Sequence, residues 1–294
     1  MKKYFFIIAS ALAVFALASC EKDKYGTLPG NDTKPHAFIK VMGAALPNDP
    51  DCDAVVRIAA NSATQEVYLF AETETAKDAR GMSDEAYADY VVANGTKVAL
   101  STNTFDGAQG ADILMPKLFG SNVVSAVAVG ANGKSIVYGE YTGIKWNTVA
   151  MGKHKYGSSA IYNNLPTPGQ YKEGVLLQQS DDDKTLFRLK DLYREGVHLQ
   201  FRTYPDYVGE DEDGKYVFCR VPAQATSLTH PSYGAMSIRD MGYRYGDDSY
   251  IFEGGYEGGM YADFSTFLCM SVYVSAGNFG AAYDVFTPTS YPTN

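Results

Sequence analysis

Short apolar segments with the spacing of β-strands, separated by turns that contain glycine and asparagine, constrain this chain more than any other feature. Residues 66–72 alternate between two faces, with Val67, Leu69 and Ala71 on one and Tyr68 and Phe70 on the other. Residues 122–129 are a second, mostly apolar strand segment, and 131–133 then offer a glycine-bearing turn before a returning strand at 136–138. The chain is also rich in tyrosine (23) and glycine (28), which favours strands joined by tight turns. The sequence therefore predicts an all-β protein, and 294 residues suffice for about two domains.

Other segments share the strand pattern. They are residues 37–42, 53–58, 175–179, 185–190, 197–203, 215–221, 249–253, 264–274 and 283–286. Two pairs read as hairpins, with turns at 180–184 and at the acidic tip 209–214. One helix is predicted over 83–94, because Ser83 can cap it, acidic residues follow in its first turn and Gly95 can end it. Its Tyr87, Tyr90 and Val91 share one face, which we expect to pack on a sheet.

The N-terminus has the anatomy of an export signal. Lys2 and Lys3 precede an apolar run over residues 4–17, and Ala18-Ser19 supplies small residues before Cys20. The run is shorter than the roughly 20 residues of a membrane-spanning helix. Leu17-Ala18-Ser19-Cys20 resembles the lipobox of bacterial lipoproteins, which implies that Cys20 becomes the first residue and carries a diacylglycerol. The alternative is an ordinary secretory signal that happens to precede a cysteine.

The resemblance implies a place in the outer membrane, with the lipid on Cys20 as the contact with the bilayer. Residues 20–24 are loosely similar to the acidic export signals of Bacteroidota surface lipoproteins, although lysines interrupt the acids. We therefore expect display at the cell surface, with a periplasm-facing anchor as the alternative. Residues 20–35 are polar and contain glycine and proline, which is typical of a flexible linker.

Four segments follow from these patterns: a signal peptide (1–19), the lipidated cysteine and linker (20–35), a first β-domain (36–145) and a C-terminal β-domain (146–294). The hairpin over 122–138 is similar to the F–G hairpin of fibronectin type III domains, which implies a β-sandwich with one inserted helix. Residues 185–196 and 273–280 resemble a C-terminal β-domain that recurs in uncharacterised Bacteroidota surface lipoproteins. We expect that domain to be an antiparallel sandwich or barrel.

Charge and cysteine content exclude several functions. The formal charge is −9, and cleavage before Cys20 removes two lysines and no acid, which takes it to −11. Such a chain repels nucleic acid and anionic lipid surfaces. Cys52, Cys219 and Cys269 remain, and we expect Cys219 and Cys269 to be buried thiols, with a disulfide between them as the alternative. The sequence contains no zinc motif and indicates no cofactor.

The candidates for metal binding and catalysis are weak. The acidic repeats at Asp49, Asp51 and Asp53 and at Asp211 and Asp213 fail the spacing of a calcium-binding EF-hand, so no metal site is assigned. No hydrolase motif occurs, and we interpret the four histidines as structural: His36, His154, His198 and His230. Glu253 and Glu257 are the nearest candidates for a glycosidase pair. Trp146, the only tryptophan, is expected to anchor the junction between the domains.

Binding remains as the favoured function. Five tyrosines cluster among glycines and acids and are the candidate ligand-binding residues: Tyr243, Tyr245, Tyr250, Tyr256 and Tyr261. Aromatic rings stack on sugar faces and carboxylates accept hydroxyl hydrogen bonds, so we predict a non-catalytic module for glycan or protein ligands. The competing interpretation is that these rings form cross-strand pairs in a sheet. An adhesin or pilus-related structural lipoprotein, or a glycan-active enzyme, is the alternative function, and the oligomeric state stays open.

Overall fold

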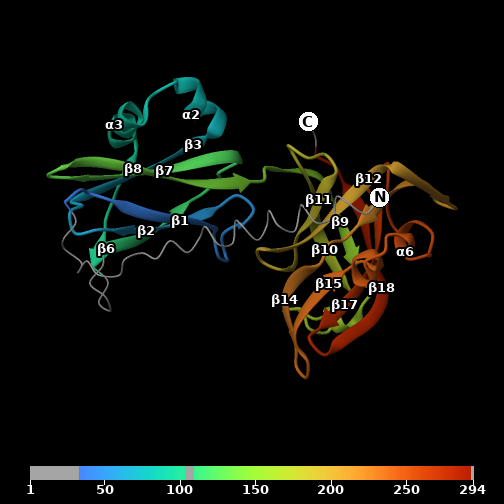
Figure 1. Ribbon diagram of the computed structural model, residues 1–294. Coiled ribbons are helices and arrows are strands. Elements are labelled where there is room, and N and C mark those ends of the chain that lie inside the picture. Colours follow the sequence, from blue (N-terminus) through green and yellow to red (C-terminus); the bar gives the residue numbers. More distant parts are fainter. Residues whose placement is uncertain (1–32, 103–108, 293–294) are drawn as a thin grey trace, which may run out of the picture.

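The computed structural model describes residues 33–102 and 109–292, which form two bodies built almost entirely from strands (Figure 1). The predicted all-β fold is therefore confirmed. The signal peptide, Cys20 and most of the linker lie outside the described residues. In the part of the chain that is described, no helix has the length and hydropathy needed to cross a bilayer.

The first body is a sandwich of two four-stranded sheets, ordered β1-β2-β6-β5 and β4-β3-β7-β8. Their strands are β1 (Ala37–Gly43), β2 (Ala54–Ala60), β3 (Glu66–Thr73), β4 (Thr96–Val98), β5 (Ser101–Thr102), β6 (Gln109–Met115), β7 (Gly120–Gly130) and β8 (Gly133–Gly143). Alternate residues of the central strands fill the space between the sheets, among them Val56, Ile58, Val67, Leu69, Val124 and Ala126. The alternation read from residues 66–72 thus corresponds to a strand with one face in this core.

Two helices, α2 (Glu74–Arg80) and α3 (Asp84–Asn94), lie on the outer face of the β4-β3-β7-β8 sheet (Figure 1). The Ser83 hydroxyl caps α3 by accepting from the backbone N–H of Ala86. Tyr87 and Val91 are buried against Val127 of β7. The predicted helix and its sheet-facing side are confirmed. Helix α2 was not predicted, although Thr73 caps it and Gly81, at φ +59°, ends it.

The hairpin of β7 and β8 also follows the prediction. Gly130 pairs with Gly133, so a two-residue turn joins the strands. Gly133 has φ +106°, a conformation that a side chain disfavours, which explains the glycine at this position. Membership of the fibronectin type III family stays a prediction.

The second body is a closed antiparallel barrel, so of the two predicted alternatives the barrel is correct. Eight strands follow one another around it: β9 (Trp146–Lys155), β10 (Tyr171–Ser180), β11 (Leu186–Arg194), β12 (Val197–Asp211), β13 (Gly214–Arg220), β16 (Gly258–Tyr261), β17 (Thr266–Val274) and β18 (Gly277–Ser290). The last strand, β18, closes the ring by pairing with both β17 and β9. The hairpin β14 (Gln224–His230) and β15 (Gly234–Arg239) continues the wall where β16 ends, because β15 pairs with the second half of β17.

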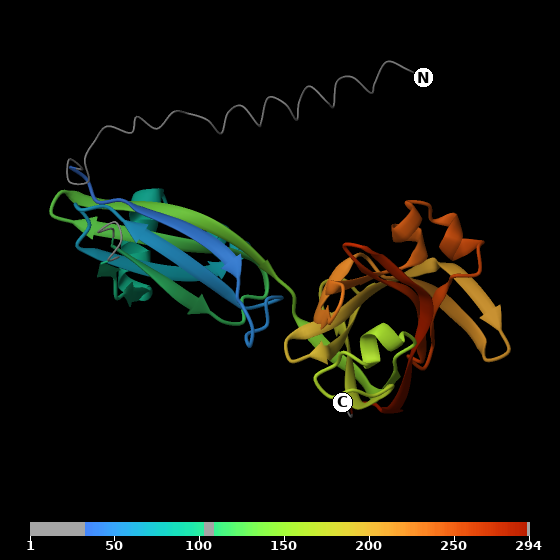
Figure 2. The same cartoon turned by 90° about the horizontal axis from the view of Figure 1, so that it is seen from below.

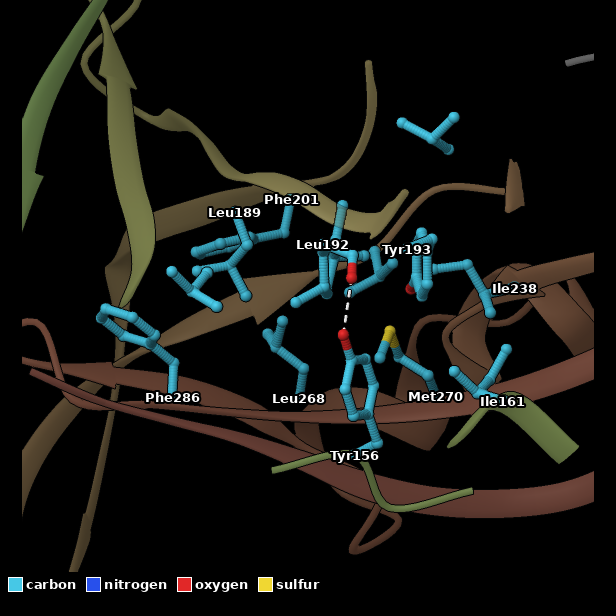
Figure 3. Close-up of a cluster of buried hydrophobic side chains, with 14 of the residues drawn as sticks. Tyr156, Ile161, Leu189, Leu192, Tyr193, Phe201, Ile238, Leu268, Met270 and Phe286 are labelled. Carbon is cyan, nitrogen blue, oxygen red and sulfur yellow. Dashed lines mark hydrogen bonds between the residues drawn. The ribbon is translucent and has the colours of Figure 1, made fainter. Parts of the chain in front are cut away.

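Apolar side chains fill the barrel interior, as Figure 3 shows for residues of β11, β12, β15, β17 and β18. The short helix α4 (Ser159–Tyr162) lies over one end of the barrel (Figure 2), and the side chain of its Ile161 belongs to this core (Figure 3). The Tyr156 hydroxyl donates to the Leu192 carbonyl at 2.5 Å, whereas the buried Tyr193 hydroxyl has no hydrogen-bond partner among the described residues. The interior of the barrel is thus a packed core.

Two expectations in this half are wrong. Residues 249–253 were expected as a strand but form helix α6 (Ser249–Phe252), beside α5 (Met241–Tyr245) on the outside of the barrel (Figures 1 and 2). The Asp247 carboxylate accepts from the Ser249 N–H at 2.9 Å and bends the chain into that turn. The tip 209–214 was expected as a longer loop, but β12 and β13 run to the register pair Asp211 and Gly214.

The three cysteines among the described residues are free thiols. Cys219 faces the barrel core, whereas Cys269 faces the outer side and packs under α5 and α6. Because they lie on opposite faces of the wall and β16 separates their strands, they cannot meet in a disulfide. The expectation of buried thiols is therefore confirmed, and burial raises the pKa of Cys269 to about 11.

Candidate functional site: an aromatic groove on the barrel wall

A groove of about 1010 Å³ crosses the outer wall of the barrel near one end. Strands β16, β17 and β18 form its floor, and the end of the β12–β13 hairpin forms one side. Its lining combines aromatic rings with carboxylates: Tyr261, Phe267, Tyr283, Asp211, Asp213 and Asp263. The described residues hold other surface hollows, but this one joins a predicted site residue to a row of rings.

The three rings form a row because they stand on neighbouring strands. The centroid of Tyr261 lies 5.8 Å from that of Phe267, and Phe267 lies 6.4 Å from Tyr283. Tyr216, which is buried, meets Phe267 and Tyr261 edge-on at 5.0 and 5.8 Å and supports the row from β13. Edge-to-face contacts of this kind are favourable and fix the ring positions.

Because Gly259 has no side chain, neighbouring rings can pack directly against the backbone of β16. A Cβ at this position would stand 2.5 Å from Phe267 Cζ and 2.5 Å from Tyr216 Cδ2. No side chain can therefore replace this glycine without displacing a ring. Gly259 pairs with Phe267 across β16 and β17, so the glycine and the ring that covers it are direct neighbours.

Polar groups line the edges of the row. The Tyr261 hydroxyl donates to Asp211 Oδ2 at 2.6 Å, which ties β16 to the acidic hairpin. Partial burial and this carboxylate raise the pKa of Tyr261, so the phenol stays protonated. Asp263 accepts from the backbone N–H and the hydroxyl of Ser265 at 2.8 and 3.0 Å. Lys215 is the one basic residue of the lining.

Of the five predicted tyrosines, only Tyr261 lies in the groove. The other four belong to the small lobe formed by α5, α6 and the turn after α6: Tyr243, Tyr245, Tyr250 and Tyr256. Tyr245 stacks on Tyr250 at 4.4 Å, and Tyr250 meets Tyr256 at 6.4 Å. None of these four tyrosines lies on a strand, so the competing interpretation of cross-strand pairs is wrong for them, and Tyr243, Tyr245 and Tyr256 are exposed.

Buried charges hold the lobe on the barrel. Asp240, 1% exposed, accepts from the Tyr243 N–H at 2.8 Å and so caps α5. The same carboxylate accepts from Arg220 Nε at 2.8 Å. The Arg220 guanidinium also lies 4.8 Å from the Tyr243 ring centroid and bonds Asp248 at 2.8 Å. The lobe is thus fixed beside the groove, and the Tyr283 hydroxyl links the two by donating to the Gly255 carbonyl at 3.1 Å.

Phe267 and Tyr283 were missed as site residues. Both belong to segments predicted as strands, and nothing local separates an outward ring that lines a groove from any other ring. The signal that could have found them is their register with Gly259 and with each other, which depends on strand pairing.

The catalytic candidates do not form a recognisable centre. Glu253 is exposed at the end of α6, and Glu257 is half-buried just before β16. His154 is buried and pairs with Asp284 at 2.9 Å inside the wall. His230 stacks on Phe279 at 5.2 Å near two hairpin tips.

A second polar cluster lies where the loop between β1 and β2 meets the barrel. Arg188, whose side chain is 3% exposed, reaches Asp49 at 2.8 Å and Asp51 at 2.7 Å. Trp146 donates its indole N–H to Asp51 at 3.1 Å and lies under the guanidinium, 4.6 Å from it. The expected junction role of Trp146 fits these contacts. Asp49, Asp51 and His198 also offer three ligand atoms within 4.8 Å of one another.

The chemistry of this cluster disfavours a metal ion. Arg188 already supplies a cation to both carboxylates. Burial acts to raise the pKa of Asp49, but His198 and Arg188 outweigh it and hold that pKa well below its usual range. His198 Nδ1 accepts from the Asp191 N–H at 2.9 Å, so neutral His198 carries its proton on Nε2, the nitrogen that a metal would need.

Comparisons with known proteins add little. No family model and no curated protein matches the chain. Among solved structures it is similar to the Kfla1895 D451A mutant, with 13% identity over 84% of this chain and a TM-score of 0.24. The same mutant in complex with isomaltose matches with 12% identity over 82% of this chain and a TM-score of 0.24. These alignments cover 29% of the solved chains, and TM-scores this low carry no argument about function.

Proposed function

We propose that this protein is a lipid-anchored, non-catalytic binding module that holds glycans in the groove on its barrel wall. The observation that carries the proposal is the row of Tyr261, Phe267 and Tyr283 beside carboxylates, in a groove of about 1010 Å³. Aromatic faces offer flat apolar surfaces to the C–H faces of sugars, and carboxylates accept hydrogen bonds from their hydroxyls. Both features occur together here.

The charge of the groove favours neutral glycans. Asp211, Asp213 and Asp263 outnumber the single Lys215 in the lining. Uronic or sialic acids would face like charges at close range, which is unfavourable where water is partly excluded. Neutral oligosaccharides avoid this repulsion, so they are the ligand class that the groove fits best.

Isothermal titration of the full mature protein in detergent tests the proposal. The panel contains neutral gluco-, manno-, xylo- and galacto-oligosaccharides and an oligogalacturonate. We expect at least one neutral ligand to bind. Phe267→Ala should lower the affinity for that ligand about 30-fold, since loss of an aromatic anchor typically costs about 2 kcal/mol. Tyr171→Ala is the matched control, because Tyr171 is an exposed barrel ring outside the groove. Failure of every neutral glycan to bind would contradict the proposal.

The same samples separate binding from catalysis. A binding module leaves its ligand intact, so no reducing ends should appear during prolonged incubation with the bound oligosaccharide. Turnover that disappears in Glu257→Gln would favour the enzyme alternative instead.

The anchor is proposed from the lipobox resemblance at Cys20. Two or more acyl chains hold a protein firmly on a bilayer, whereas one chain holds it only marginally. We expect mass spectrometry of the mature N-terminal peptide to find diacylglycerol on Cys20, and Cys20→Ser to move the protein out of membrane fractions. An unmodified Cys20 in the mature protein would contradict the anchor and leave the groove proposal unaffected.

A further inference from the structure

Neighbouring rings of the groove do not share a plane. The Tyr261 and Phe267 rings are tilted by 48° to each other, and the Phe267 and Tyr283 rings by 42°. A sugar ring contacts an aromatic face fully only when the two are nearly parallel. A flat ligand surface that stacks on Phe267 would therefore touch only the edges of the rings on either side.

Contacts with the surrounding structure fix these tilts. The Tyr261 hydroxyl donates to Asp211 Oδ2 at 2.6 Å, and the Tyr283 hydroxyl donates to a backbone carbonyl of the lobe at 3.1 Å. Phe267 lies between them and meets the buried Tyr216 edge-on, at 5.0 Å and 79°. The rings cannot turn into one plane without losing these contacts, so the site is preorganised in its tilted form.

The row is also recessed. The end of the β12–β13 hairpin stands along one side of the groove with Asp211, Asp213 and Lys215. Phe267, in the middle of the row, is half-buried. A rigid flat surface wider than the groove would rest on this side and would not reach the Phe267 ring.

These two features distinguish between forms of the same polysaccharide. In a single dissolved chain, successive sugar rings turn relative to one another about the glycosidic bonds, so each can face a differently tilted aromatic ring. In crystalline cellulose or chitin, packed chains present their sugar faces in one plane. Building on the proposed glycan function, we propose that the groove selects single dissolved polysaccharide chains and excludes the flat faces of crystalline polysaccharides.

The test compares the two forms with the full mature protein in detergent. Cellohexaose, chitohexaose, mannohexaose, maltohexaose and xylohexaose are titrated in solution, and microcrystalline cellulose and crystalline chitin are tested by co-sedimentation. We expect at least one hexaose to bind, and Phe267→Ala to lower its affinity about 30-fold. The two solids should sediment no more of the native protein than of the Phe267→Ala variant.

A second variant tests whether the fixed tilt contributes. Tyr261→Phe keeps the ring and removes its bond to Asp211, so the affinity for the hexaose should fall about threefold to tenfold, as when one ordered side chain becomes mobile. Tyr68→Phe is the matched control and should leave the affinity unchanged, because it removes a 2.7 Å bond to Glu66 in the first domain.

The outcomes separate this inference from the proposed function. Co-sedimentation with a crystalline solid that Phe267→Ala abolishes would overturn the selection for dissolved chains and leave glycan binding in place. An unchanged affinity in Tyr261→Phe would overturn the role of the fixed tilt. If neither a hexaose nor a solid binds, the proposed function fails and this inference fails with it.

Discussion

Arg188 bonds two carboxylates that precede it by 139 and 137 residues, and it does so with a side chain that is 3% exposed. Its Nε donates to Gln178 at 2.8 Å, so all three guanidinium nitrogens donate hydrogen bonds, and Trp146 packs against the group. Removing one partner from a buried ion pair leaves the other charge without compensation. The junction between the domains therefore depends on this residue.

Arg188→Met should lower the free energy of unfolding by about 3–5 kcal/mol, because Asp49 and Asp51 lose their buried partner. Arg57→Met is the matched control, since Arg57 pairs with Asp112 at 2.8 Å on the open surface and such pairs contribute about 0–1 kcal/mol. Urea unfolding of both variants measures the difference. If both variants lowered the free energy of unfolding by the same small amount, the junction would not depend on Arg188.

At the scale of elements, the pair α5 and α6 depends on one carboxylate. Asp240 caps α5, accepts from the Val221 N–H at 2.8 Å and pairs with Arg220. The helices are too short to be stable by themselves. Apolar contacts of Met241 and Ile251 with Cys269 supply the remaining attachment.

Asp240→Ala should destabilise the protein by about 3–5 kcal/mol and loosen α5 and α6 before the barrel. Hydrogen exchange of the Arg244 and Gly246 amides, compared with that of amides in β11, shows whether α5 and α6 lose protection before the barrel does. Ser83→Ala, which removes the cap of α3, is the control and should cost only about 1 kcal/mol. Uniform exchange throughout the barrel would contradict a separable lobe.

Local patterns were enough to predict most strands and α3, because alternation, turn glycines and helix caps act over a few residues. The run Ser249–Glu253 was misassigned because a short apolar segment does not distinguish strand from helix. Local patterns could not predict the groove, because Tyr261, Phe267 and Tyr283 come together only through the pairing of β16, β17 and β18. The meeting of Arg188 with Asp49 and Asp51 is equally long-range and left no local signal.

At the scale of the whole molecule, a sandwich precedes a barrel whose interior is packed and whose outer wall carries the rings. The contacts of Asp49 and Asp51 with Arg188 fix the barrel to the sandwich. The central claim is that the groove, and not the lobe beside it, receives the glycan.

Ring-resolved carbon–proton NMR tests that claim most directly, with the tightest neutral oligosaccharide titrated into the full mature protein. We predict saturable shifts of the Tyr261, Phe267 and Tyr283 ring signals and nearly unchanged signals from Tyr245 and Tyr171. Shifts confined to Tyr245 and its lobe neighbours, or no ring shifts at saturating ligand, would contradict it.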